Sequence, residues 1–199
     1  TDDPSFSAEL SSNTGLLKID RLPSAGLLPV NKTLALQALL SAGLTLNPED
    51  SRTALESVRL TGRHQELSYK GIKIILDVAH NPAAAGALAQ KMAFAEGRTL
   101  AIASVLEDKD WAGIVTAMGN VVDDWFIAQI SDTPRASEGQ TLLEVLYNDG
   151  RTGQLLESIG QALDSALEQA TADDRIVVFG SFHTVAAVLN IILAEVSSE

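Results

Sequence analysis

From residue 62 onward, short apolar runs alternate with segments that carry helix signals. Four runs rich in Val, Ile, Leu or Phe predict buried strands at 73–78, 99–105, 125–130 and 175–180. The segments between and after them predict helices at 82–95, 111–122, 138–146, 154–170 and 182–195. This alternation predicts an α/β fold, with a Rossmann-like and mostly parallel sheet that has helices on both faces.

Two further segments complete the predicted architecture. Residues 63–70 are expected to pair antiparallel with 72–78 through a turn at Lys70-Gly71, which gives an edge strand. Residues 1–60 predict only one strand at 16–19 and two helices near 32–42 and 48–58. Since such pieces would leave apolar faces uncovered, we expect residues 1–60 to be the end of a preceding domain and residues 61–199 to be a second domain.

The composition excludes several classes of protein. A formal net charge of −12, from 14 Lys and Arg against 26 Asp and Glu, argues against binding to nucleic acid or to an anionic membrane. The chain has no Cys, so it has no disulfide and no thiolate nucleophile. It also has no apolar run near the ~20 residues of a membrane span and no signal-peptide pattern, which argues against a membrane-spanning or secreted protein. We therefore expect a cytoplasmic protein. Because the sequence begins with Thr1, we also expect that an upstream segment is missing from it.

Polar residues gather where the predicted strands end. Asp77, His80 and Asn81 follow the run at 73–78, and Pro82 can begin the next helix. Ser181 follows the last run in the same way. In open α/β sheets, ligands bind in the crevice beyond the carboxyl ends of the strands. These residues are therefore candidates for a binding site.

Several sequence blocks carry a resemblance to a known family. The segments ILDVAHNPAAAGAL, SVLEDKDWAGI, TPRAS and FGSFHTVAAVL resemble the C-terminal domain of bacterial dihydrofolate synthase/folylpolyglutamate synthase, a member of the Mur ligase superfamily. The segment LPVNKTLALQALLSAG resembles the last helical region of the central ATPase domain in that family. The resemblance covers most of residues 27–195, in the order of the family.

The resemblance implies a reaction and its participants. It implies ATP-dependent ligation of L-glutamate to dihydropteroate or folate through an acyl phosphate, with Mg²⁺ as the metal. Separately, we expect the protein to be a monomer. The phosphate loop and the metal ligands of the family belong to the preceding domain, and this chain contains no G-x-x-x-x-G-K-[ST] motif. We therefore assign no metal ligand here and expect the chain to be inactive without that domain.

The resemblance also implies nucleotide contacts for four residues. Asn31 and Arg63 are expected to contact ATP, although Asn31 also suits a helix N-cap and Arg63 also suits a solvated or ion-paired surface residue. Asp77 is expected to bind the nucleotide through the ribose hydroxyls, with capping of a nearby loop as the alternative. His80 is expected to bind phosphate oxygens and is our one catalytic candidate. The alternative is that its side chain only hydrogen-bonds to backbone groups.

Three more residues are expected near the incoming glutamate. Ser181 could hydrogen-bond a carboxylate of the ligand, and its position is explained equally well by an N-cap role. His183 could point into the crevice or pack against the next helix. Lys109 suits an anion contact or an exposed surface charge. Two other functions stay open: a different amide ligase of the Mur superfamily, and a stand-alone nucleotide-binding module without catalysis.

Overall fold

A computed structural model describes residues 5–13, 15–24, 26–92, 94–130 and 133–197. The chain divides into two compact units, Thr1–Arg63 and His64–Glu199. Each unit is described by itself. In the described part of the chain, no helix combines the length and the apolarity that a membrane span needs.

The first unit is a β-hairpin covered by two helices. Its elements are β1 (Ser5–Ser12), β2 (Gly15–Pro23), α1 (Pro29–Ser41) and α2 (Pro48–Ser57). One face of the hairpin is buried by both helices and the other face is exposed. The core residues of this unit are Ala8, Leu10, Ile19, Leu22, Leu36 and Leu55.

The strand predicted at 16–19 lies within β2, but the prediction missed β1. Strand β1 pairs antiparallel with β2, so the helices and strands form a small core of their own. The missed signal was the alternation of Phe6, Ala8 and Leu10 with Ser and Glu, because a period of two is typical of a half-buried strand. The apolar faces that we expected to be uncovered are therefore partly buried within the unit.

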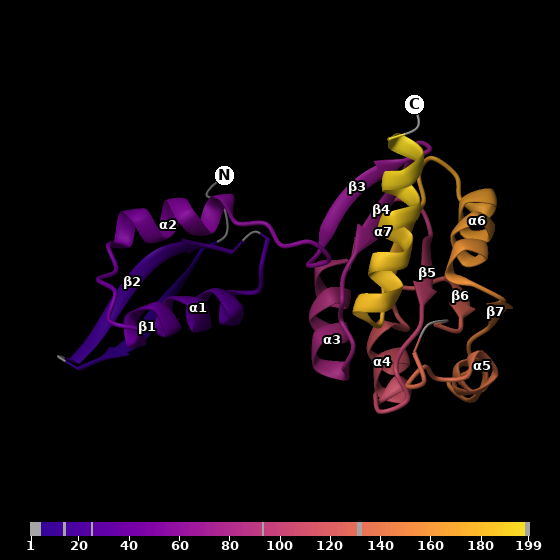
Figure 1. Ribbon diagram of the computed structural model, residues 1–199, viewed down its shortest axis with the longest axis horizontal. Helices are drawn as coiled ribbons and strands as arrows, with labels where there is room; N and C mark the ends of the chain where they lie inside the picture. Colours follow the sequence, from indigo (N-terminus) through magenta and orange to yellow (C-terminus); the bar gives the residue numbers. More distant parts are fainter. Residues whose placement is uncertain (1–4, 14, 25, 93, 131–132, 198–199) are drawn as a thin grey trace. The chain divides into compact units, whose positions relative to one another are not determined.

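The second unit contains a six-stranded sheet in the order β3-β4-β8-β5-β6-β7 (Figure 1). The strands are β3 (Gln65–Tyr69), β4 (Ile72–Leu76), β5 (Thr99–Ala103), β6 (Asp124–Ala128), β7 (Gly153–Leu156) and β8 (Arg175–Phe179). Strand β3 pairs antiparallel with β4, and all other neighbours are parallel. The α/β fold and the antiparallel edge strand are therefore confirmed.

Helices cover both faces of this sheet. They are α3 (Pro82–Lys91), α4 (Trp111–Met118), α5 (Gly139–Asn148), α6 (Ile159–Gln169) and α7 (Phe182–Val196). Ala85, Ile114 and Leu142 place α3, α4 and α5 in one core. Ala162 and Val188 place α6 and α7 in the other core, on the opposite face.

Two helix predictions were wrong in detail. The predicted helix at 154–170 is strand β7 followed by α6, because residues 153–156 pair with β6 and the Ser158 side chain caps a new helix. The helix predicted from 138 begins at Gly139, and its N-cap Glu138 makes no side-chain cap hydrogen bond. The capping box that we read at Ser137 and Gln140 is not formed, since Ser137 instead donates its N–H to Val105 O at 3.2 Å.

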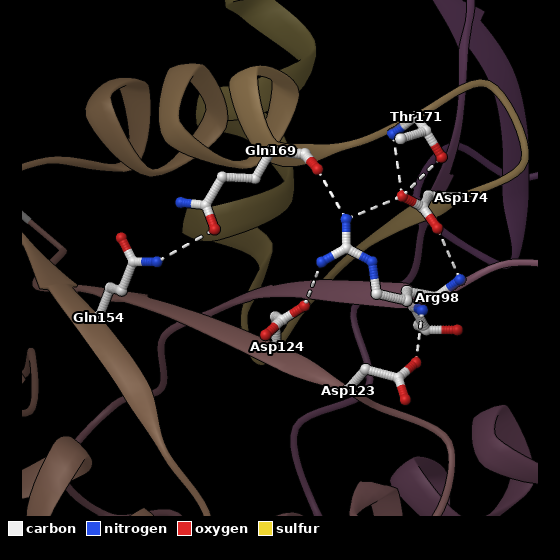
Figure 2. Close-up of polar contacts among 8 residues, drawn as sticks. Arg98, Asp123, Asp124, Gln154, Gln169, Thr171 and Asp174 are labelled. Carbon is white, nitrogen blue, oxygen red and sulfur yellow. Dashed lines mark hydrogen bonds and ion pairs between the residues drawn. The ribbon is translucent and has the colours of Figure 1, made fainter.

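The amino ends of the central strands are joined by a network of charged side chains (Figure 2). Arg98 precedes β5 and donates to Asp124 Oδ2 and Asp174 Oδ2, each at 3.0 Å, and to Gln169 O at 2.7 Å. Asp174 precedes β8 and accepts the Arg98 N–H at 2.6 Å and the N–H and hydroxyl of Thr171. The network therefore joins β5, β6, β8 and the end of α6 at one edge of the sheet.

Candidate functional site

The candidate residues of the second unit follow the carboxyl ends of three adjacent strands, β4, β8 and β5. Two backbone hydrogen bonds extend the pairing past the ends of β4 and β8: Asp77 N–H to Val178 O at 3.0 Å, and Gly180 N–H to Ala79 O at 2.9 Å. The chain then leaves β4 and β5 toward helices on one face, and leaves β8 toward α7 on the other face. Such a divergence is where open α/β sheets bind ligands.

Gly180 makes this close approach of the strand ends possible. Its φ is +106°, and a Cβ there would lie 2.3 Å from Ser104 O. A side chain at this position is therefore excluded by conformation and by contact with the backbone of the neighbouring strand. The glycine places the start of α7 directly beside the end of β5.

The Asp77 carboxylate fixes two backbone segments. Its Oδ1 accepts the Ala79 N–H at 2.9 Å, and its Oδ2 accepts the His64 N–H at 2.8 Å. Each carboxylate oxygen has two lone pairs, so each retains acceptor capacity after these bonds. Asp77 therefore acts as a loop anchor and can still accept hydroxyl groups of a ligand.

His80 has a defined tautomer when it is neutral. Its Nδ1 lies 2.9 Å from Val78 O, and a carbonyl oxygen can only accept. Nδ1 therefore carries the proton, and Nε2 is an acceptor in the neutral ring and a donor in the imidazolium. The neighbouring Asn81 caps α3, since its Oδ1 accepts the Ala84 N–H at 2.9 Å.

Ser181 caps α7 and is almost fully buried. Its Oγ accepts the Thr184 N–H at 3.0 Å and lies 2.7 Å from Thr184 Oγ1. Thr184 in turn reaches across to β5 and donates to Ser104 O at 3.0 Å. The N-cap role of Ser181 is therefore present, and Ser181 and Thr184 belong to one hydrogen-bonded group that joins α7 to β5.

His183 and Lys109 have different surroundings. His183 is exposed in the first turn of α7, two residues after Ser181. Lys109 lies on the loop after β5, and its Nζ is 2.7 Å from Asp108 Oδ2. Arg135 donates to the other oxygen of Asp108 at 2.8 Å. The hydrogen bond from Lys109, followed by that from Arg135, lowers the pKa of Asp108 to about 2.

Asn31 and Arg63 belong to the first unit. Asn31 is exposed in the first turn of α1, and the N-cap of that helix is Leu28, so the N-cap interpretation of Asn31 was wrong. Helix α1 begins earlier than predicted because Pro29 occupies its first turn. Arg63 is the last residue of the unit, and its N–H donates to Leu60 O at 3.1 Å.

Three residues beside the predicted ones escaped the sequence analysis. His64 has a φ of +47° and donates its N–H to Asp77, while its buried Nδ1 has no hydrogen-bond partner among the described residues. Burial lowers the pKa of His64, and the positive charge of Lys91 lowers it further. Thr184 and Ser104 were also missed. For Thr184 a signal existed, since it stands three residues after Ser181, which we predicted as a possible N-cap from its position.

The described residues contain no group of three or more His, Asp or Glu side chains placed to hold a metal ion. A hollow of about 490 Å³ lies at the carboxyl ends of β6 and β7, beside the start of α5. Gln129, Glu138 and Leu155 are among its lining residues, and none of our predicted site residues lines it. The candidate site is therefore defined by the ends of β4, β8 and β5 and not by this hollow.

Comparison with known families gives one domain match. Residues 62–182 match the family described as "Mur ligase, glutamate ligase domain". The chain is 39% identical, over 176 residues, to dihydrofolate synthase/folylpolyglutamate synthase of Escherichia coli K12. The match covers 87% of this chain and 40% of that protein. The chain therefore spans about two fifths of the length of this curated relative.

Comparison with solved structures agrees. E. coli FolC in complex with DHPP and ADP has a TM-score of 0.79 and 38% identity, covering 93% of this chain and 43% of that one. A bifunctional folylpolyglutamate synthase/dihydrofolate synthase with Mn, AMPPNP and L-glutamate bound has a TM-score of 0.79 and 32% identity. That match covers 92% of this chain and 45% of the other.

Proposed function

Because this chain belongs to the Mur ligase family through its glutamate ligase domain, we propose that it is the C-terminal part of an ATP-dependent amide ligase. The proposed reaction joins L-glutamate to dihydropteroate, to folate or to both. The pteroate or folate carboxylate takes the terminal phosphoryl group of ATP, and the glutamate amine then displaces phosphate to form the amide. Such chemistry depends mainly on positioning and on stabilisation of charge.

The single observation that carries this proposal is the arrangement of Asp77, His80 and Ser181 on the adjacent ends of β4 and β8. This arrangement stands in a fold similar to relatives whose structures hold ADP, AMPPNP, Mn or L-glutamate. Asp77 retains lone pairs that suit the hydroxyls of a ribose, and His80 retains Nε2 for a phosphate or an amine. Ser181, His183 and Lys109 are our candidates on the glutamate side.

The proposal includes a domain division and a metal. We assign residues 1–60 to the end of an ATPase domain and residues 61–199 to the Mur ligase C-terminal domain. The family match from residue 62 and the division of the compact units at Arg63 support this boundary. Asn31 and Arg63 would contact ATP from the ATPase side. As the family resemblance implies, Mg²⁺ would be held by residues of that preceding domain.

The first experiment measures release of phosphate by the whole protein, with ATP and Mg²⁺. We expect release that depends on L-glutamate together with dihydropteroate or a reduced folate. The proposed function would be contradicted if the protein released no phosphate when L-glutamate was supplied with either dihydropteroate or a reduced folate. It would also be contradicted if the protein ligated only a muramyl substrate. The alternative ligase of the same superfamily is thereby tested in the same assay.

The second experiment tests the site. We expect His80→Ala to lower kcat/KM by about a hundredfold, which is typical for the loss of a charge-stabilising or proton-transferring group. Asp77→Asn should lower kcat/KM by about tenfold, mainly by raising the KM for ATP, because hydrogen bonds from the ribose to a charged carboxylate are lost. Asp164→Asn, on the exposed surface of α6, is the matched control and should leave kcat/KM unchanged. Wild-type rates in both site variants would remove the proposed site while leaving the proposed reaction standing.

A further inference from the structure

Three hydroxyl-bearing residues at the candidate site are joined by hydrogen bonds whose direction is fixed. Thr184 Oγ1 is 3.0 Å from Ser104 O, and this carbonyl oxygen can only accept. Thr184 therefore donates its single hydroxyl proton to Ser104. The Oγ atoms of Thr184 and Ser181 are 2.7 Å apart. Because Thr184 has no second hydroxyl proton, Ser181 is the donor in that bond.

Ser181 thus uses most of its hydrogen-bonding capacity inside the protein. Its Oγ donates to Thr184 Oγ1 and also accepts the Thr184 N–H at 3.0 Å. A hydroxyl has one proton and two lone pairs, so one lone pair of Ser181 is left. Toward a ligand, Ser181 is an acceptor that has no proton to give.

We propose that Thr184 is a positioning residue for glutamate, because it holds the Ser181 proton and leaves Ser181 a lone pair for the substrate's amino group. This inference rests on the proposed function. An ammonium or amine group carries N–H donors and matches a lone pair. A carboxylate carries only acceptors, so it would face the lone pair of Ser181 unfavourably. The amino group is also smaller than the carboxylate. A smaller group can reach Ser181 more easily, because Ser181 is only 5% exposed.

The surrounding backbone keeps this arrangement in place. Gly180 brings the start of α7 against Ser104 O, where a Cβ would lie 2.3 Å away. Thr184 is fully buried, so water does not compete for its bond to Ser104. Since Ser104 is the residue that follows β5, the hydroxyl group of Ser181 is oriented by a different strand from the one it follows.

The test variant is Thr184→Val in the whole protein, which keeps the shape of the side chain and removes its hydroxyl. We expect the KM for L-glutamate to rise about tenfold, the effect of one hydrogen bond of ordinary strength, and the KM for ATP to change less than about twofold. Thr184→Ser retains the hydroxyl and should stay within about twofold of wild type for both substrates. Equal rises in the two KM values, or no rise for glutamate, would overturn the proposal.

Glutarate distinguishes the amino group from the carboxylates, because it is the same dicarboxylate without the amine. As a competitor of glutamate, glutarate should inhibit Thr184→Val and Ser181→Ala as it inhibits wild type, within about twofold. If its inhibition constant rises together with the KM for glutamate, Ser181 serves a carboxylate and the inference is wrong. If Thr184→Val does not fold, Thr184→Ala tests the role of the Thr184 hydroxyl in the same way, and Ser181→Ala tests the contact between Ser181 and the amino group.

The unaltered protein separates this inference from the function on which it rests. Glutamate-dependent phosphate release by wild type supports the proposed reaction before any variant is made. Its absence would remove the proposed function and the role of Thr184 together. A wild type that ligates glutamate, beside a Thr184→Val variant with unchanged KM values, would overturn only the role of Thr184.

Discussion

In the second unit, the amino ends of the strands form one side of the sheet, which we call the amino edge, and their carboxyl ends form the opposite side, the carboxyl edge. These two edges hold their polar groups in different ways. At the amino edge, Arg98 and Asp174 bind each other and their neighbours through charged side chains (Figure 2). At the carboxyl edge, Asp77 and Ser181 are held by backbone N–H groups and by one neighbouring hydroxyl. Asp174 at the amino edge accepts four hydrogen bonds and is buried, whereas Asp77 at the carboxyl edge accepts two and is partly exposed, which leaves it more capacity for a ligand.

This difference separates stability from binding within one sheet. The Asp174 side chain is 4% exposed and accepts four hydrogen bonds, one of which is its ion pair with Arg98, so its loss leaves buried donors without partners. Asp77 accepts two bonds and remains partly exposed. We therefore expect substitutions at the amino edge to lower the free energy of unfolding with little effect on catalysis, and substitutions at the carboxyl edge to affect catalysis first.

Gly180→Ala has the largest expected effect and is an exception to this division. Gly180 lies at the carboxyl edge, but its substitution should lower the stability of the fold. A left-handed φ and a contact with Ser104 O act together there, and we expect the free energy of unfolding to fall by about 4 kcal/mol. Urea unfolding followed by tryptophan fluorescence measures this, because both Trp residues, Trp111 and Trp125, lie in the core of this unit.

Gly71→Ala is the matched control for Gly180→Ala. Gly71 has a φ of +80° in the β3–β4 turn, but a Cβ there would meet nothing within 4 Å. Its substitution should cost only the conformational part, about 1 kcal/mol. Equal losses at Gly180 and Gly71 would show that the close approach to Ser104 is unimportant.

Asp174→Asn is the next largest expected effect. The amide keeps the shape but cannot accept all the bonds that the carboxylate accepts, and it leaves Arg98 without its buried partner. We expect a loss of about 2 to 3 kcal/mol in the same urea experiment. The neighbouring exposed Asp173 provides the control, since Asp173→Asn should change little.

Activity is the second measurement on Asp174→Asn. In the whole protein, under conditions where the variant is folded, kcat/KM should stay within about twofold of wild type, since Asp174 lies at the opposite edge from the candidate site. A folded variant with strongly reduced kcat/KM would contradict the division between the two edges.

The pH dependence of stability also tests whether Asp174 stabilises the fold. Backbone N–H donation from Thr171, together with the bonds from Arg98, lowers the pKa of Asp174 to about 2 from its usual 3.8. A carboxyl whose folded pKa is lowered stabilises the protein above its unfolded pKa, and that contribution is lost as the pH falls toward the folded pKa. Wild type should therefore lose Tm more steeply than Asp174→Asn between about pH 4 and pH 2. Parallel curves would contradict this.

How far the sequence predicted the fold can be judged from particular elements. The runs at 99–105 and 175–180 became β5 and β8, because a continuous apolar run suits a strand buried on both faces. Strand β7 was missed, since its four residues at the sheet edge carry no such run and precede a true helix. The order of the strands, with β8 between β4 and β5, follows from pairing between distant residues that no local pattern records.

The candidate site was predictable in part for a similar reason. Asp77, His80 and Ser181 stand at strand ends, and strand ends can be found from hydrophobic runs alone. Thr184 in α7 donates to the carbonyl oxygen of Ser104, the residue after β5, and these two residues are 80 positions apart in the sequence. His64 donates through its backbone, which any residue could supply, so its identity held no signal for that contact.

Asp108→Asn gives the smallest expected effect and the closest comparison with Asp174. The pKa of Asp108 is also lowered to about 2, in this case by the side chains of Lys109 and Arg135. Its side chain is 50% exposed, however, so solvent screens these ion pairs and they contribute little to stability. We expect the Tm of Asp108→Asn to match wild type between pH 2 and pH 5, within measurement error. If Asp108→Asn flattened the acid part of the curve as Asp174→Asn does, a lowered pKa would govern stability whatever the burial, and the contrast between the two edges would fail.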